Sequence, residues 1–203
     1  MVAGAIILSG GKSSRMGTNK ALLKINEITN IERVKNQLME SFQDIILVTN
    51  EPNEYEFLNI RMTSDQYPGK GPLAGLHAGL VDSDHDVNLV VACDMPFVSN
   101  ELACYFVEAI GDYDAVIPII NGKQHPLFSV FKKHVIDQIE DSLKSDRLRM
   151  KHLLEQIHVR FMTEKDLEKV RLENLERIFF NMNNPTEYED AKKWAKEDNQ
   201  KGV

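Results

Sequence analysis

Residues 1–23, MVAGAIILSGGKSSRMGTNKALL, place a short apolar run directly before a loop rich in glycine and serine. The run from Val2 to Leu8 predicts a buried strand, because it is short, contains branched side chains and is closely followed by glycine. The loop at residues 9–17 offers backbone N–H groups and hydroxyls that can approach an anion closely. Arg15 and Lys20 add full positive charges of the kind that phosphate oxygens bind. The stretch therefore predicts a strand that leads into a site for nucleotide phosphates.

This loop differs from the two common phosphate-binding motifs. A Walker A loop needs the spacing G-x-x-x-x-G-K-[ST], whereas Lys12 follows Gly10 and Gly11 directly. The dinucleotide fingerprint G-x-G-x-x-G is also absent, since the two glycines are adjacent. The alternative at this point is an ordinary strand-to-helix turn with solvated lysines, because such turns often contain glycine.

The composition is that of a soluble globular protein, with 203 residues of which 42% are hydrophobic and 27% are charged. We expect a single domain over residues 1–203, with the polar tail from about residue 198 to 203 frayed. A net charge of −7 argues against nucleic acid as a partner. An acidic protein that binds an anionic nucleotide must concentrate its cations locally, as the loop near the N-terminus does.

The two cysteines, Cys93 and Cys104, are too few for a disulfide framework and form no C-x-x-C metal pair. Residues 2–8 are too short for a signal peptide and lack its basic lead. No apolar run approaches the roughly 18 residues that cross a bilayer. These features predict a cytoplasmic protein that does not contact membranes.

Apolar runs typical of strands alternate with helical patterns along the rest of the chain. Further strands are predicted at residues 45–49, 87–93, 115–120, 125–131, 159–162 and 178–180, and helices at residues 31–42, 73–81, 101–110, 135–143, 150–156 and 184–197. Near-continuous apolar strands separated by helices are typical of a mostly parallel sheet that is covered on both faces. We therefore predict a three-layer α/β/α fold, in which the alternating segment 125–131 pairs antiparallel with a neighbour.

Polar residues follow four of the predicted strands, at the points where each strand ends. They are residues 9–17, 49–51, 94–96 and 181–185. Ligands of parallel α/β sheets bind beyond the carboxyl ends of the strands. We expect these four segments to meet at one edge of the sheet.

Asp94 is the strongest single candidate among them. It directly follows the apolar run VVAC and lies two positions before Pro96, so it is held at a strand tip. A carboxylate there suits Mg²⁺, which takes one or two protein oxygens and fills its other positions with water and phosphate. The alternative is an aspartate that only caps a helix or a turn. Asn181 and Asn183 could orient substrate or a metal-bound water, or else only form the turn before Pro185.

Residues 65–76, DQYPGKGPLAGL, form a loop of glycine and proline that leads into a helix, with Asp65 at its entrance. A carboxylate can accept N–H groups from a guanine edge or hydrogen-bond a ribose hydroxyl. The alternative is a plain turn. No metal-binding spacing links the histidines, and no Ser-His-Asp or Cys-His pattern indicates covalent catalysis.

Together these motifs resemble a known family. LSGGKSSRMGTNKALL at residues 8–23 is similar to the signature LAGGxSxRMGxDKALL of nucleotidyltransferases, some of which act on cytidylyl or sugar-phosphate substrates. The later motifs, in this order, resemble those of molybdenum cofactor guanylyltransferases, in the molybdopterin nucleotidyltransferase family: GPLAGL at 71–76, CDMPFV at 93–98, HPL at 125–127 and NMNNP at 181–185. The resemblance extends from Ile6 to about Tyr188 and implies a Rossmann-like nucleotidyltransferase topology.

The resemblance also implies an activity and its substrates. The protein would transfer GMP from GTP to the terminal phosphate of molybdopterin that carries molybdenum, and would release pyrophosphate with the help of Mg²⁺. Other proteins of molybdenum cofactor biosynthesis and molybdoenzyme acceptors would be its partners.

Roles for single residues follow from the same resemblance. The backbone of three residues would hold GTP: Leu8, Ser9 and Gly10. Lys20 would contact GTP and Asp65 its base or ribose, while Asp94 would bind both the nucleotide and the metal. Arg15 would steady the triphosphate, so that Arg15, Lys20 and Asp94 form the catalytic set.

Three asparagines complete the implied site. Asn50, after the second predicted strand, would touch the nucleotide. Asn181 and Asn183 would lie on the pterin side.

The chain departs from the family pattern at four places. Ser9 replaces the usual alanine, which is compatible with a role for its backbone alone. Asn19 replaces the usual aspartate and so removes a charge capable of positioning Lys20. Thr29-Asn30 stands where proline-leucine is common, and Asn184 stands where threonine is usual.

Two other functions stay open at this point. One is a cytidylyltransferase that acts on the same pterin or on a sugar-alcohol phosphate. The other is a non-catalytic GTP-binding regulator that kept the loop and lost the chemistry. The presence of Asp94, Lys20 and Arg15 argues against the regulator.

Overall fold

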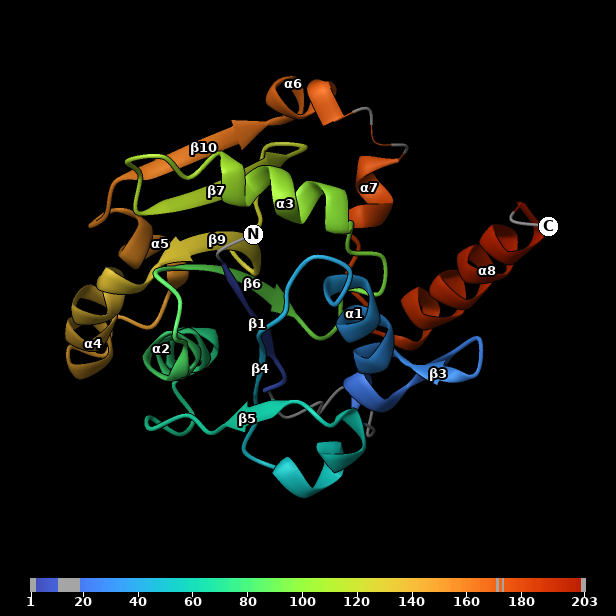
Figure 1. Cartoon of the computed structure of the whole chain (residues 1–203), viewed down its shortest axis with the longest axis horizontal. Helices are drawn as coiled ribbons and strands as arrows, with labels where there is room; N and C mark the ends of the chain where they lie inside the picture. The colour runs from blue at the N-terminus through green and yellow to red at the C-terminus, as the bar shows by residue number, and fades with distance from the viewer. Residues whose placement is uncertain (1–2, 11–18, 171, 173, 202–203) are drawn as a thin grey trace.

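The computed structural model describes residues 3–10, 19–170, 172 and 174–201 (Figure 1). Its main sheet contains β1 (Gly4–Leu8), β4 (Ile45–Val48), β5 (Arg61–Thr63), β6 (Val87–Ala92), β7 (Ala115–Ile120), β8 (Lys123–Gln124), β9 (Phe128–Lys132) and β10 (Val159–Thr163). The strand order is β10-β7-β9-β6-β1-β4-β5, with β8 paired to β7. Strand β9 runs antiparallel to β6 and β7, β8 runs antiparallel to β7, and the other pairs are parallel. The mostly parallel sheet and its antiparallel strand are both confirmed.

Helices cover both faces of this sheet. They are α1 (Asn30–Leu38), α2 (Pro72–Asp82), α3 (Asn100–Glu108), α4 (Ile136–Lys144), α5 (Met150–Leu154), α6 (Glu164–Leu167), α7 (Leu175–Ile178) and α8 (Pro185–Lys201), with 3₁₀ turns η1 (Lys20–Leu22), η2 (Pro52–Leu58), η3 (Lys133–Val135) and η4 (Glu168–Val170). Helices α1 and α3 pack on one face, and α2, α4 and α5 pack on the other. The predicted three layers are therefore confirmed. None of the helices in the described ranges is long and apolar enough to cross a membrane.

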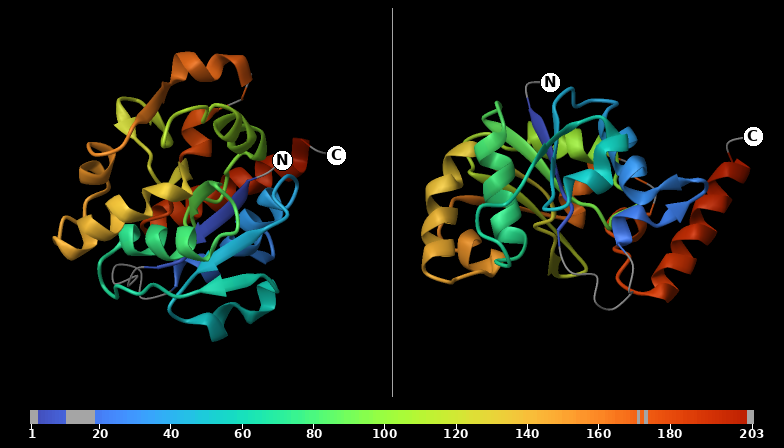
Figure 2. Two further views of the ribbon diagram at one scale, coloured as in Figure 1. Left: turned by 60° about the vertical axis from the view of Figure 1, so that its left-hand side comes forward. Right: turned by 90° about the horizontal axis from the view of Figure 1, so that it is seen from below.

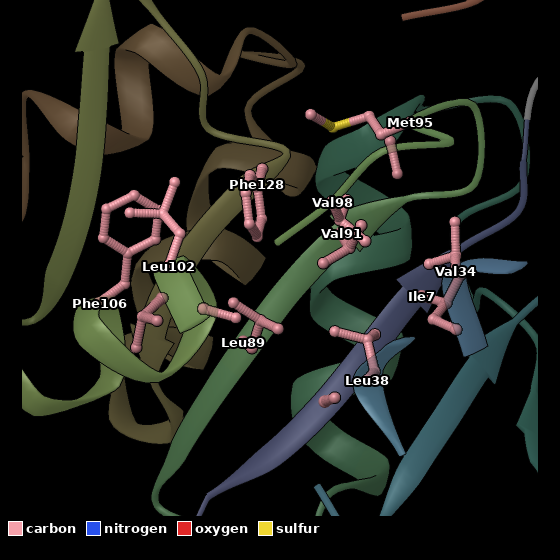
Figure 3. Packing of buried hydrophobic residues seen from close by; sticks show 14 of the residues in the cluster. Ile7, Val34, Leu38, Leu89, Val91, Met95, Val98, Leu102, Phe106 and Phe128 are labelled. Atoms are coloured by element: carbon pink, nitrogen blue, oxygen red, sulfur yellow. The ribbon is translucent and has the colours of Figure 1, made fainter. Parts of the chain in front are cut away.

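The strands are apolar throughout because each of their faces meets a helix layer. Ile7 of β1 packs on the α1–α3 side, whereas its neighbours Ile6 and Leu8 pack on the α2 side. Figure 3 shows the first of these cores, where sheet residues such as Ile7 and Leu89 lie against Val34, Leu38, Leu102 and Phe106 of the helices. Side chains alternate between faces along a strand, so two buried faces require a continuous apolar run.

Two glycines of α2 allow this helix to lie close to β1. A methyl group at Gly79 would stand 2.4 Å from Cγ2 of Ile6, and one at Gly75 would stand 3.3 Å from Cδ2 of Leu8. Gly75 and Gly79 of the segment GPLAGLHAGL therefore act in packing. They bring the start of α2 to the carboxyl end of β1.

The order of the strand connections reverses direction at β1. From β1 the chain passes through α1 to β4 and on to β5, and then returns through α2 to β6 on the opposite side of β1. Ligands of open α/β sheets bind at such a switch point, outside the carboxyl ends of the strands. The fold therefore places the loops after β1 and β6 at the position where a ligand is expected.

One predicted strand, residues 178–180, is wrong. Residues 175–178 form α7, and the Asn174 side chain accepts a hydrogen bond from the Arg177 backbone N–H at the start of this helix. An apolar run as short as Ile-Phe-Phe does not distinguish a strand from the end of a buried helix. The predicted helix limits also shift: α1 ends at Leu38 instead of residue 42, and α8 continues to Lys201, past residue 197.

A second small sheet, formed by β2 (Lys24–Ile25) and β3 (Ile28–Thr29), was not predicted. Its two-residue turn consists of Asn26 and Glu27, both with positive φ. This hairpin packs on α8, and Figure 2 shows the two together at one side of the molecule. We call the hairpin, α8 and the segment 181–184 that precedes α8 the arm. Its core is a separate cluster of four buried residues: Ile25, Met182, Ala191 and Ala195.

Candidate active site

Polar residues line the carboxyl edge of the sheet in the order of the strands. Asp65 follows β5, Asn50 follows β4, Ser9 follows β1 and Asp94 lies just after β6. The segment 181–185 does not follow a strand, contrary to prediction, but it still reaches this edge. The Met182 N–H donates to the Asp94 carbonyl at 2.9 Å. The predicted convergence of four polar segments is thus confirmed for the described residues, although one arrives from the arm.

Asp94 is half-buried at the switch point beside β1. The Cys93 N–H donates to the Leu8 carbonyl at 3.0 Å, which fixes the backbone just before Asp94. Burial raises the pKa of the Asp94 carboxyl, the nearby Lys20 ammonium opposes this rise, and the Glu187 carboxylate adds to it. Asp94 is therefore an aspartate whose negative charge is costly until a cation approaches it.

Lys20 lies close to this carboxylate. It is the first residue of η1, whose N-cap is Asn19. The Lys20 Nζ donates to the Asn183 Oδ1 at 3.3 Å. The basic group from the amino end and the acid from mid-chain thus share one space with an asparagine of the arm. Arg15, the other predicted cation of the catalytic set, lies outside the described residues.

The buried Met182 holds the two neighbouring asparagines in place. Its side chain packs inside the arm, while Asn181 is half-buried and Asn183 is exposed. Asn184 then begins α8, since its Oδ1 accepts from the Glu187 N–H at 3.0 Å. Glu187 in turn accepts from the backbone N–H groups of Asn183 and Asn184. This reciprocal pair is a capping box, so Asn184 performs the capping that the usual threonine would perform.

Asp65 and Asn50 bind each other at the other end of the edge. The Asn50 Nδ2 donates to the Asp65 Oδ2 at 2.8 Å, and the Asp65 N–H donates to the Asn50 Oδ1 at 3.2 Å. The second carboxylate oxygen of Asp65, Oδ1, is buried and finds no hydrogen-bond partner among the described residues. A buried acceptor without a donor is unfavourable, so this oxygen is able to accept a further hydrogen bond.

The loop that follows Asp65 is tied to α4. Gly69 and Gly71 adopt φ values of 81° and 71°, which favour glycine. Between them, the Lys70 Nζ donates to the Leu143 carbonyl at 2.6 Å. The Tyr67 hydroxyl donates to Glu140 at 3.1 Å. Lys70 therefore anchors the loop to α4.

Comparison with known proteins shows which family has this arrangement. The model of the MobA-like NTP transferase domain matches residues 5–189. The chain belongs to this family. A MobA-like NTP transferase is an enzyme of the nucleotidyltransferase class, so the predicted resemblance is confirmed.

Relatives of this MobA-like protein match it over most of their length. A protein of Clostridium perfringens named "Probable molybdenum cofactor guanylyltransferase" is 37% identical, with 92% of this chain and 94% of the relative covered. One of the same name from Pelotomaculum thermopropionicum is 36% identical, with coverage of 95% and 93%. The crystal structure of molybdopterin-guanine dinucleotide biosynthesis protein A from Archaeoglobus fulgidus superposes with a TM-score of 0.82 at 25% identity, covering 96% of this chain and 99% of that one.

The donor set of the MobA-like site suits a hard divalent cation. Within the described ranges, no group of three or more His, Cys, Asp or Glu side chains could hold a metal ion. Asp94 instead offers one carboxylate, and its backbone carbonyl is hydrogen-bonded to Met182, which lies between Asn181 and Asn183. A cation that needs few protein oxygens and completes its shell with water and phosphate fits these residues.

Sequence reasoning missed two residues of this MobA-like site. Tyr55 is buried and accepts hydrogen bonds from Ser9 and Asn19, and nothing local in the sequence indicated this. Asn30 is fully buried, its Nδ2 donates to the Cys93 carbonyl, and its Oδ1 finds no partner among the described residues. The unusual Thr29-Asn30 pair was the available signal for Asn30.

Proposed function

We propose that the protein transfers GMP from GTP to the terminal phosphate of molybdenum-bearing molybdopterin and releases pyrophosphate. The observation that carries this proposal is the meeting of Lys20, Asp94 and Asn183 at the switch point between β1 and β6. The guanylyltransferase names of relatives that match more than nine-tenths of the chain support the choice of substrates.

The order of polar groups along the sheet edge fits the order of groups in a nucleotide. From β5 to β6 the edge crosses three inter-strand spacings, or about 14 Å. The free oxygen of Asp65 can accept from a guanine N–H or a ribose hydroxyl at one end. The backbone of residues 8–10 lies between Asp65 and Asp94 along this edge, where we expect the triphosphate. Asp94 and Lys20 stand at the other end, where the α-phosphate would react.

The reaction is an in-line displacement at phosphorus. A phosphate oxygen of the pterin attacks the α-phosphorus of GTP, and the bond from this phosphorus to the bridging oxygen of pyrophosphate breaks. The protein contributes positioning and charge neutralisation. Lys20 stabilises the negative charge as it moves to the leaving group. We assign the same task to Arg15, and contacts with the pterin to Asn181 and Asn183.

We assign Mg²⁺ to the carboxylate of Asp94. The half-buried carboxylate, whose pKa is raised by burial, suits a hard cation that neutralises its charge. Bound there, Mg²⁺ would neutralise charge on the α-phosphate and on the leaving group. We also propose one cytoplasmic domain over residues 1–203, with other molybdenum cofactor biosynthesis proteins and molybdoenzyme acceptors as partners.

The test is a transfer assay with product identification. The purified protein is incubated with Mg²⁺, molybdopterin with or without molybdenum, and either GTP or CTP, and the product is identified by mass. A guanine dinucleotide with release of pyrophosphate is the expected result. A preference for CTP would support a cytidylyltransferase instead, and GTP binding without turnover would support a regulator.

A further inference from the structure

The hydroxyl of Tyr55 joins two residues that lie apart in the chain. Tyr55 lies in η2 and is 2% exposed. Its Oη accepts from the Ser9 Oγ at 2.7 Å and from the Asn19 Nδ2 at 2.8 Å. Ser9 directly follows β1, and Asn19 directly precedes Lys20. One buried oxygen therefore links the end of the central strand to the residue before the proposed catalytic lysine.

Asn19 uses both ends of its side chain amide. Its Oδ1 accepts from the Ala21 N–H at 3.1 Å and so caps η1, the turn that begins with Lys20. Its Nδ2 donates to Tyr55 and also to the Glu54 Oε2 at 2.8 Å. The amide thus fixes the start of η1 against η2. Lys20 is the next residue along the chain, so the backbone from which its ammonium reaches Asn183 is held in place.

Ser9 and Asn19 are also two of the positions where the sequence departs from the family pattern. Alanine at position 9 would offer no hydroxyl to Tyr55. Aspartate at position 19 would keep the cap on η1, but it could only accept from the Tyr55 hydroxyl and would face the Glu54 carboxylate. The two departures therefore serve the same buried oxygen. A buried tyrosine hydroxyl needs hydrogen-bond partners. Here one partner is Ser9, directly after β1, and the other is Asn19, directly before η1.

We propose that Tyr55 is a positioning residue, which sets Lys20 for phosphate binding through its hydrogen bonds to Ser9 and Asn19. This inference rests on the proposed function. Tyr55 acts from behind the site and touches neither substrate nor reacting atoms. We call the Ser9–Tyr55–Asn19 contacts the tyrosine bridge.

The first test is a double-mutant cycle between Tyr55→Phe and Lys20→Ala in the transfer assay. Tyr55→Phe should lower kcat by about 10- to 100-fold, since small misplacements of a catalytic group are costly. In the Lys20→Ala background the same change should cost less than about twofold, because the group that it positions is gone. Fully additive losses would overturn the proposal. Tyr105→Phe is the matched control, because its hydroxyl donates to the Asp166 carbonyl and so joins α3 to α6, outside the bridge.

A second test restores the bridge in another form. Asn19→Asp should lower kcat by about tenfold, since two carboxylates then face each other. Adding Glu54→Gln should restore most of this loss, because the glutamine amide can donate to the new aspartate. If the double variant is no faster than Asn19→Asp alone, the assigned role of Asn19 is wrong.

Failure of the proposed function can be told apart from failure of the bridge. If the wild-type protein turns over no nucleotide, the proposed function fails, and the Tyr55–Lys20 cycle is measured on the Kd for GTP with Mg²⁺. Thermal unfolding without nucleotide measures the contribution of the tyrosine bridge to stability, independently of any activity. Tyr55→Phe and Ser9→Ala should destabilise the protein by less together than the sum of their separate effects. Additive effects on unfolding would show that the hydroxyls do not interact and would overturn the bridge.

Discussion

The Lys20 Nζ donates to the Asn183 Oδ1 at 3.3 Å, although 163 positions separate the two residues in the chain. One partner is carried by the loop after β1 and the other by the start of the arm. The proposed reaction space thus has the sheet edge on one side and the arm on the other. Neither part contains the site alone.

Replacing Lys20 by alanine should reduce kcat/KM by at least about a hundredfold, as expected for loss of one charge-stabilising donor. Lys20 also lowers the pKa of Asp94, so its removal lets that pKa rise further. The acid limb of the pH–rate profile should therefore move to higher pH. Pyrophosphate release as a function of pH measures both effects, with Lys151→Ala on α5 as the control. A variant with an unchanged rate would remove Lys20 from the mechanism.

Asp94→Ala should abolish turnover, and Asp94→Asn should do so while making the fold more stable at pH 7. Burial raises the pKa of Asp94 above its unfolded value, so the folded protein binds this proton more readily. The charged form therefore costs stability above the raised pKa. The cost disappears as the pH falls through that pKa towards 3.8, the ordinary pKa of an aspartate.

Thermal unfolding at pH 7 and near pH 4 checks this linkage. Each 1 kcal/mol gained corresponds to a rise in Tm of about 2–4 °C for a chain of this size. The difference in Tm between Asp94→Asn and wild type should shrink at the lower pH. Pyrophosphate release at the wild-type rate by either variant would refute the assigned role of Asp94.

Asp65→Ala should raise the KM for GTP by about 10- to 100-fold, the range expected when one charged hydrogen bond is lost. The kcat value should change little, because Asp65 lies away from the reacting phosphate, at the β5 end of the edge. Asp86→Ala is the control, since Asp86 is an exposed aspartate just before β6. If kcat of the Asp65 variant falls by as large a factor as its KM for GTP rises, Asp65 has a role at the phosphates instead.

Gly79→Ala should destabilise the protein by about 1–3 kcal/mol, because overpacking forces α2 away from β1. The added methyl group would meet Ile6 at 2.4 Å, whereas at Gly75 it would meet only the tip of Leu8 at 3.3 Å. Gly75→Ala should therefore cost less. Urea unfolding of both variants measures the difference, and a larger loss at Gly75 would contradict this view of the α2–β1 contact.

The sheet and its binding edge could be predicted because their signals are local. Apolar runs such as residues 45–49 and 115–120 predict buried strands, and the polar residues that follow predict where these strands end. Asp94 and Asp65 were found in this way, and the structure brings both to the edge. Whether each performs its assigned role stays a prediction.

The hairpin of the arm and the tyrosine bridge could not be predicted for the opposite reason. The turn of the hairpin uses Asn26 and Glu27 at positive φ, whereas the usual signal there is Asn-Gly. Tyr55 reaches Ser9 and Asn19 across 46 and 36 positions, so only the folded chain joins them. Such contacts depend on tertiary packing, which cannot be derived from the hydrophobic periodicity of the sequence.

Because the core of the arm is small, we expect the arm to unfold at a lower free energy than the main sheet. In the described residues the cluster between the hairpin and α8 has four buried members, whereas the sheet is packed on both faces by much larger clusters. Amide hydrogen exchange should thus be faster in α8 than in β1 or β6, because the arm opens by partial unfolding. Each opening carries Asn183 away from Lys20. On gentle warming the enzyme should lose turnover before the far-UV circular dichroism of the sheet changes.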